Sequence, residues 1–131
     1  MAEVKSYIVC PFRHRRVALT PEEHVRQHFL GRLVSDYHYP TTLISVERPI
    51  RGRRYDAVVF SPDLTPLVLI EFKREEVPLT QVVMDQAACY NRALRVPYLI
   101  ISNGPQTLVA HVTDEGVDFL NDIPQWTQLL N

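Results

Sequence analysis

The sequence YDAVVFSPDLTPLVLIEFK, residues 55–73, decides the fold. Two runs of β-forming residues, 55–60 and 67–73, flank a loop bounded by prolines, Ser61–Pro66, and this pattern predicts a β-hairpin. The second run is almost continuously apolar, which is typical of a strand that is covered on both faces. We therefore expect the run 67–73 to lie near the centre of a sheet.

Three charged residues interrupt these apolar strands: Asp56, Glu71 and Lys73. Isolated charges in buried strands are costly unless they are paired or bound to a metal. Glu71 and Lys73 are two apart in a strand, so they point to the same face. If the strands pair symmetrically about the loop, Asp56 lies opposite Glu71, with Cβ atoms about 5 Å apart. Two carboxylates so placed repel each other, and each raises the pKa of the other.

A divalent cation would remove the repulsion between Asp56 and Glu71. Mg²⁺ suits such a pair, because it prefers few carboxylates, retained waters and the phosphate oxygens of a substrate. Lys73 could then orient or help deprotonate a water nucleophile, or stabilise charge on a phosphorane-like transition state. The alternative is a structural ion pair between Lys73 and a carboxylate at the strand ends, since this spacing is common by chance.

A helix from about Pro21 to Ser35 is predicted ahead of the hairpin. Thr20 is suited to be its N-cap, Pro21 to be its first residue, and Glu23 to complete a capping box. Apolar residues then recur every four positions: Val25, Phe29 and Leu33. At 100° per residue, Glu22 falls on this apolar face and Glu23 at its edge. We therefore expect Glu22 to point inward, either toward a site or because the helix dipole favours an acid there.

A second helix is predicted from Leu79 to about Arg95, with an inward stripe of Val82, Gln86, Tyr90 and Ala93. Gln86 and Tyr90 are four apart, so their polar ends would reach the same side of the sheet. The alternative for these two is a core tyrosine beside a hydrogen-bonded glutamine. Because a helix precedes it, the apolar run Pro97–Ser102 is expected to lie parallel to 67–73 through a right-handed crossover.

Shorter segments complete a mixed β-sheet flanked by helices, the pattern of an α/β (α+β) fold. They are a strand at Leu43–Glu47, a turn at Asn103-Gly104, strands at Leu108–Val112 and Val117–Leu120, and a short helix at Ile123–Leu130. The 131 residues are 46% hydrophobic and contain no repeat or Gly/Ser linker, so we expect one domain over residues 1–131.

The net charge of −1 hides an asymmetry, because residues 1–55 carry +5 and residues 56–131 carry −6. Seven basic residues of the first half lie in two clusters: Arg13, Arg15, Arg16 and Arg48, Arg51, Arg53, Arg54. If both clusters face one surface, they form a patch that attracts phosphates; the alternative is a set of solvated loop arginines. Nucleic-acid contacts are expected first from Arg51, Arg53 and Arg54.

Several other classes of protein and site are disfavoured. No apolar run approaches the ~20 residues that cross a bilayer, and Met1–Ser6 lacks the apolar core of a signal peptide, so we expect a cytoplasmic protein without a membrane partner. Cys10 and Cys89 are expected to be reduced, buried thiols. His24 and His28 have a zinc-like spacing without a third ligand nearby, so surface histidines are expected.

The set Asp56, Glu71-Phe72-Lys73, Gln86 and Tyr90 resembles the PD-(D/E)xK nuclease pattern with the QxxxY extension of RecB-like nucleases. Four further segments extend the likeness: Leu19–Gln27, Asp85-Gln86, Tyr90-Asn91 and Tyr98–Gly104. Together they resemble the N-terminal nuclease domain of the type I restriction endonuclease R subunit, over about Val17 to Pro124. Tyr55 stands where the pattern has its proline, which is a common variation.

This resemblance implies a restriction-endonuclease-like fold that cuts DNA phosphodiesters with Mg²⁺ or Mn²⁺. Asp56 and Glu71 would hold the metal together with the main-chain carbonyl of Phe72, and Lys73 would serve the attacking water. Glu22 would support the metal site, and two further residues would position DNA or Lys73: Gln86 and Tyr90.

Two features limit what the resemblance implies. R subunits continue into an ATP-driven helicase motor, whereas the four glycines of this chain form no Walker-type loop, so we expect no ATP-driven translocation by this chain. The alternative function is a non-catalytic nucleic-acid or protein interaction module that retains the nuclease fold. An active nuclease would need a homodimer or a partner protein, because one small domain offers one active site for two strands.

Overall fold

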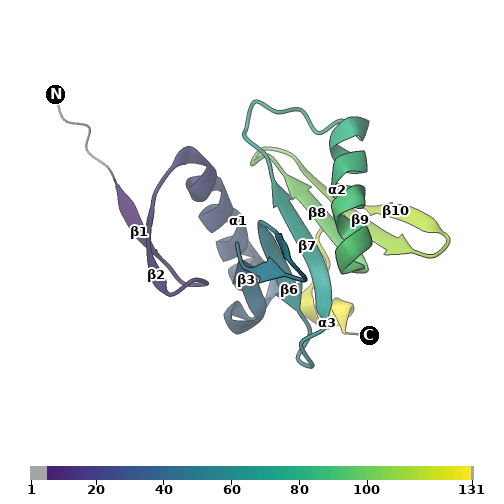
Figure 1. Ribbon diagram of the computed structural model, residues 1–131, viewed down its shortest axis with the longest axis horizontal. Coiled ribbons are helices and arrows are strands. Elements are labelled where there is room, and N and C mark those ends of the chain that lie inside the picture. Colours follow the sequence, from purple (N-terminus) through teal and green to yellow (C-terminus); the bar gives the residue numbers. More distant parts are fainter. Residues whose placement is uncertain (1–5, 131) are drawn as a thin grey trace.

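A six-stranded sheet, in the order β10-β9-β8-β7-β6-β3, forms the centre of the molecule (Figure 1). The computed structural model describes residues 6–130, except the side chains of Tyr90 and Ala93. The strands of this sheet are β3 (Ile44–Val46), β6 (Ala57–Phe60), β7 (Pro66–Phe72), β8 (Tyr98–Ser102), β9 (Thr107–Thr113) and β10 (Gly116–Leu120). The helices are α1 (Pro21–Tyr37), α2 (Gln81–Leu94) and α3 (Trp126–Leu129), with a 3-10 turn at Thr41–Leu43.

The β6–β7 hairpin has the register predicted from its loop. Ala57 pairs with Ile70, Val58 with Leu69 and Val59 with Val68, all antiparallel. The register shifts by one between Val59 and Phe60, next to the loop, where a bulge absorbs the extra residue. The symmetric pairing therefore holds at the end of the hairpin that lies beside Asp56 and Glu71.

The strand β7 is central, as its apolar run predicts. It pairs with β6 on one side and, in parallel, with β8 on the other, where Val68 lies opposite Tyr98 and Phe72 opposite Ser102. The connection from β7 to β8 runs through α2, which confirms the predicted helical crossover.

Helices cover both faces of the central strands. On one face, Phe29, Leu30 and Leu33 of α1 pack with Val68 and Ile70, and Leu129 of α3 joins them. On the other face, α2 and the sheet share a second core: Val83, Ala87 and Leu94 with Val58, Leu69 and Ile101. Alternate residues of β7 thus enter different cores, which explains its continuous apolar sequence and confirms the α+β fold.

Replacing Ile70 with alanine is expected to lower the free energy of unfolding by about 2–5 kcal/mol, because it leaves a cavity in a site with no solvent exposure. Urea denaturation followed by circular dichroism would measure the loss. Val117→Ala is a matched control, since Val117 is 48% exposed and its truncation should change stability by less than about 0.5 kcal/mol. Similar losses for the two variants would contradict the central placement of β7.

The rotation of α2 about its axis differs from the prediction. Its buried residues are Val83, Met84, Ala87, Asn91 and Leu94, whereas Val82 and Gln86 are exposed. Because Val82 and Val83 are adjacent, the helix face that contains Val82 and the face that contains Val83 looked equally apolar in the sequence. Packing against the sheet buries the face that contains Val83. For the same reason Cys89 is exposed, not buried, while Cys10 is buried as expected. The predicted inward positions of Tyr90 and Ala93 lie outside the described side chains.

Two small hairpins were not predicted: β1 (Tyr7–Cys10) with β2 (Arg15–Ala18), and β4 (Pro49–Ile50) with β5 (Arg53–Arg54). Helix α1 also runs two residues beyond its predicted end and stops at His38, whose φ of 65° is left-handed. Within residues 6–130, no helix combines the length and apolar character needed to cross a bilayer. That residues 1–131 form one domain stays a prediction.

Candidate metal-dependent nuclease site

Asp56 and Glu71 lie side by side where β6 begins and β7 ends. The backbone N–H of Phe72 donates to Asp56 Oδ2 at 2.8 Å, which holds the Asp56 carboxylate against the end of β7. Burial, reinforced by the charge of Asp56 and a hydrogen bond between the two carboxyls, raises the pKa of Glu71 to about 8. The predicted repulsion between the two carboxylates is therefore present in the fold.

Lys73 follows directly after β7 and belongs to the same group. Its backbone N–H donates to the carbonyl of Ser102 at 2.8 Å. The chain therefore stays beside the end of β8 for one residue after β7 ends. The charge of Lys73 acts to lower the pKa of Glu71, although burial and Asp56 outweigh it. The three charged residues that interrupt the two apolar strands thus lie together, as predicted.

A cavity of about 270 Å³ opens beside this group. Seven residues line it: Glu22, Arg26, Asp56, Phe72, Lys73, Arg74 and Val77. Glu22 therefore lines the same cavity as Asp56, but its side chain is exposed. The expectation that Glu22 points inward was wrong. A charged side chain at the mouth of a cavity stays solvated, which is cheaper than burial on the apolar face of α1.

Glu23, which was predicted to complete a capping box, is the buried acid of the pair. The N-cap prediction is confirmed, because Thr20 Oγ1 accepts from the Glu23 N–H at 3.1 Å. The Glu23 carboxylate, however, binds Arg13 Nη2 at 2.5 Å and Gln27 Nε2 at 3.0 Å. Burial opposes its ionisation, but these hydrogen bonds bring the pKa of Glu23 below its usual value. The role assigned to Glu23 was wrong because its partner Arg13 is distant in sequence.

A buried ion-pair network extends from Glu23 beside the cavity. Arg13 Nη1 lies 3.3 Å from Glu47 Oε2, and Arg26 Nη2 lies 3.3 Å from Glu47 Oε1. This network removes Arg13 from the predicted phosphate-attracting cluster. The i, i+3 spacing of Glu23 and Arg26 was a sequence signal for part of it, but nothing in the sequence indicated Glu47.

A comparison with protein families identifies the chain. The model of the family described as "Type I restriction enzyme R protein N terminus (HSDR_N)" matches residues 21–124. The chain belongs to this R protein N-terminal family. A search of curated proteins finds no match to the chain. The matched range contains the cavity residues described above, and the family supports a nuclease-like role at the level of the family.

Gln86, the first residue of the predicted QxxxY extension, is not brought into the cavity of this R protein N-terminal domain. Gln86 is exposed on α2 and is absent from the cavity lining. The side chain of Tyr90 lies outside the described residues. The position of Gln86 follows from the rotation of α2, whose buried stripe begins at Val83.

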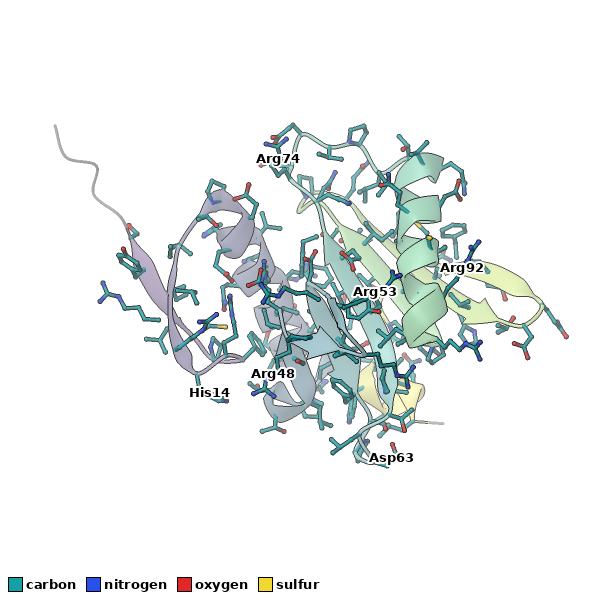
Figure 2. All side chains as sticks on the ribbon, viewed as in Figure 1. His14, Arg48, Arg53, Asp63, Arg74 and Arg92 are labelled. Carbon is teal, nitrogen blue, oxygen red and sulfur yellow. The ribbon has the colours of Figure 1, made fainter. Side chains whose placement is uncertain are left out.

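The arginines predicted to contact nucleic acid lie on and beside the β4–β5 hairpin. Arg53 and Arg54 have exposed side chains on β5, and Arg53 is labelled in Figure 2. Arg51 adopts a left-handed φ of 52° in the turn, and its Nη1 donates to the carbonyl of Leu94 at 3.5 Å. That contact places the hairpin turn at the C-terminal end of α2.

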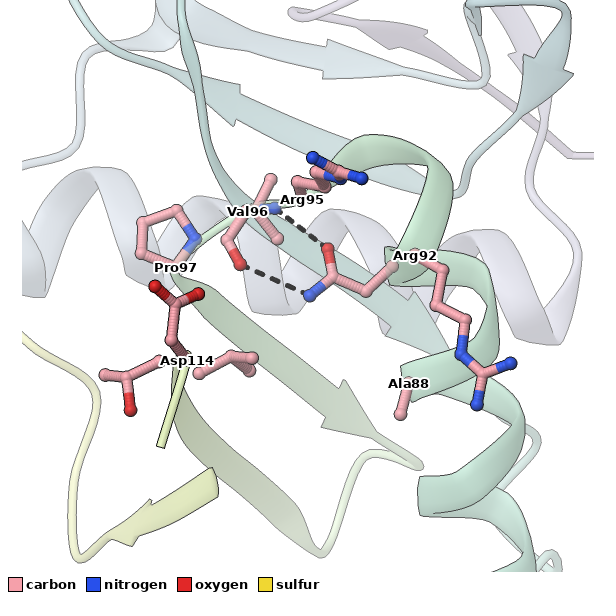
Figure 3. Close-up of a pocket in the computed structure, with 9 residues that line it drawn as sticks. Ala88, Arg92, Arg95, Val96, Pro97 and Asp114 are labelled. Atoms are coloured by element: carbon pink, nitrogen blue, oxygen red, sulfur yellow. Dashed lines mark hydrogen bonds between the residues drawn. The ribbon is translucent and has the colours of Figure 1, made fainter. Parts of the chain in front are cut away.

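A larger hollow of about 720 Å³ lies at the C-terminal end of α2 (Figure 3). Arg92, Arg95, Asp114 and Asn91 line it, and Asn91 makes two hydrogen bonds with the backbone of Val96, at 2.9 and 3.2 Å. The neighbouring carboxylates of the candidate site are absent from its lining. The larger hollow is therefore separate from the candidate site.

The candidate site has the donor set that suits Mg²⁺ or Mn²⁺. Residues 6–130 contain no cluster of three or more His, Cys, Asp or Glu that could hold a metal. Mg²⁺ does not require such a cluster, because it is commonly bound by one or two carboxylates, waters and substrate phosphates. The like charges of Asp56 and Glu71, and the raised pKa of Glu71, are the conflict that a cation would relieve. His24 and His28 are exposed, as expected.

Proposed function

We propose that this chain is a nuclease domain that hydrolyses DNA phosphodiesters with the help of Mg²⁺ or Mn²⁺. The observation that best supports this function is the Asp56–Glu71 pair beside Lys73. Asp56 and Lys73 line a cavity, and the chain belongs to the R protein N-terminal family. Membership in a restriction-enzyme family favours DNA as the substrate and a multi-subunit assembly as the setting.

The residues of the site divide the chemistry among them. Asp56, Glu71 and the carbonyl oxygen of Phe72 would hold the metal, which would supply Lewis-acid stabilisation of charge on the phosphoryl oxygens. Hydrolysis adds water to phosphorus and breaks the bond to the leaving sugar oxygen. Lys73 orients the attacking water and stabilises the negative charge that develops in the transition state. The Phe72 N–H keeps Asp56 in place throughout.

Other residues act around this centre. Glu22 supports the metal site from the rim of the cavity. Gln86 and Tyr90 position DNA or Lys73, and Arg51, Arg53 and Arg54 contact the DNA phosphates along the β4–β5 hairpin. Double-strand cleavage requires a second copy of the chain or a partner protein, because one domain supplies one site.

The variant Asp56→Asn tests the function. The side-chain amide oxygen of the variant can still accept from the Phe72 N–H, so the fold should persist while the negative charge is lost. We expect calorimetric titration to show weaker Mg²⁺ and Mn²⁺ binding. Cleavage of plasmid and single-stranded DNA should fall by more than about 10³-fold, since several kcal/mol of transition-state stabilisation are removed.

Asp63→Asn is the matched control, because Asp63 is an exposed acid in the β6–β7 loop. Metal binding and cleavage that persist in the Asp56 variant would overturn the proposal. Salt-dependent DNA binding by the wild type, without metal binding or cleavage, would instead favour a non-catalytic interaction module.

A further inference from the structure

Arg26 is a buried cation on the wall of the candidate cavity. It lies on the second turn of α1 with 8% of its surface exposed, and it lines the cavity together with Asp56 and Lys73. Its Nη2 donates to Glu47 Oε1 at 3.3 Å, and its Nε lies 3.9 Å from Glu23 Oε2. Two carboxylates therefore hold the guanidinium in position.

The anchoring of Arg26 leaves donors unused. Among the described residues, neither Nε nor Nη1 of Arg26 has a hydrogen-bond partner, although both are buried. A buried donor without a partner is costly, and the cost is larger for a charged group. Arg13 belongs to the same network, but none of its side-chain nitrogens is both buried and without a hydrogen-bond partner. Arg13 also does not line the cavity. The unused donors are thus particular to the arginine at the cavity.

The charges of the cavity indicate an anionic ligand for these donors. Asp56 presents negative charge at one wall, and a phosphodiester entering beside it needs cations on the other walls. A guanidinium N–H donates a directed, charge-assisted hydrogen bond to a phosphate oxygen, more specifically than a lysine ammonium does. Arg26 has two nitrogens, Nε and Nη1, that make no hydrogen bond to the described residues.

We propose that Arg26 binds a non-bridging oxygen of the nucleic-acid phosphodiester through one of its unpaired N–H donors, with Glu23 and Glu47 holding the guanidinium in place. The proposal rests on the proposed function, since it names a substrate contact of the same site. The phosphate reaches the guanidinium from the cavity, past the exposed side chains of Glu22 and Arg74, which border an adjoining hollow.

The test compares Arg26→Gln with Arg13→Gln. Both variants remove one positive charge from the same ion-pair network, so losses of stability and of general electrostatic attraction are matched. Fluorescence anisotropy would measure the affinity for short labelled DNA oligonucleotides, single-stranded and duplex, in EDTA and in Ca²⁺. We expect Arg26→Gln to weaken binding at least tenfold and to reduce the salt slope by about 0.7–0.9, one phosphate contact, while Arg13→Gln changes affinity by less than about threefold.

The outcomes separate this inference from the proposed function. Wild-type binding that depends on Arg26, without cleavage in Mg²⁺ or Mn²⁺, would support the phosphate contact and refute the nuclease. Equal effects of the two variants, or no DNA binding by the wild type, would overturn the contact. If Arg26→Gln fails to fold, the Nε–H resonance of Arg26 in ¹⁵N-labelled wild type decides: it should shift on addition of the oligonucleotide, and an unchanged resonance would overturn the proposal.

Discussion

Replacing Lys73 with methionine is expected to lower the rate of DNA cleavage by about 10²–10⁴-fold, the range typical for loss of a proton-transfer or charge-stabilising group. Methionine keeps much of the apolar stem of lysine but removes the ammonium. Asp56 keeps its hydrogen bond from the Phe72 N–H, and both carboxyls remain, so the variant should still bind Mn²⁺. The expected signature is therefore a loss of turnover at saturating metal, measured on plasmid and single-stranded DNA.

Arg32→Met is the control for Lys73→Met. It also removes one positive charge, but from the exposed face of α1, where Arg32 pairs only with Asp36 among the described groups, at 3.4 Å. This control should cleave at the wild-type rate. Cleavage by Lys73→Met within about tenfold of the wild type would show that Lys73 has only a structural role beside Glu71.

The sequence predicted the β6–β7 hairpin well because the constraints on it are local. The prolines bounding the loop and the apolar run that ends at Glu71 allow one register, and a shift by a single residue would turn every buried side chain to the wrong face. The neighbourhood of Asp56, Glu71 and Lys73 follows directly from that register. The crossover to β8 is likewise determined by chain order and handedness.

The rotations of the helices were harder to predict, because the partners that decide them are distant. Glu23 is buried because Arg13, in a hairpin that sequence patterns did not indicate, binds it. Hydrophobic periodicity alone places charged residues at the surface. Glu22 was predicted to point inward only because of its angular position on the helix. On α2, Val82 and Val83 support two different faces, and only contact with the sheet distinguishes them. Buried charge networks escape periodicity arguments, since their stability comes from pairing and not from hydrophobicity.

In the absence of divalent metal, the free energy of unfolding is expected to decrease as the pH rises from about 5 to 8, because of Glu71. Burial and the charge of Asp56 raise the folded-state pKa of Glu71 to about 8, from an ordinary value of 4.5. Between these two values the folded protein holds a proton that the unfolded chain has released. The stabilising contribution is therefore complete below about pH 4.5 and is lost as the pH passes the folded-state pKa, with a slope of at most about 1.4 kcal/mol per pH unit.

Urea denaturation in EDTA at several pH values would measure this dependence. Glu71→Gln should flatten it and exceed the wild type in stability at pH 8, because a neutral side chain replaces a buried charge, whereas the exposed Glu75→Gln should follow the wild-type curve. Glu23 does not interfere, since its lowered pKa places its titration below pH 4.5. Mn²⁺ should stabilise the wild type more at pH 8 than at pH 6, because at the lower pH the metal must displace a proton from Glu71. Parallel curves for the wild type and Glu71→Gln would refute the coupling between the two carboxyls on which the candidate metal site depends.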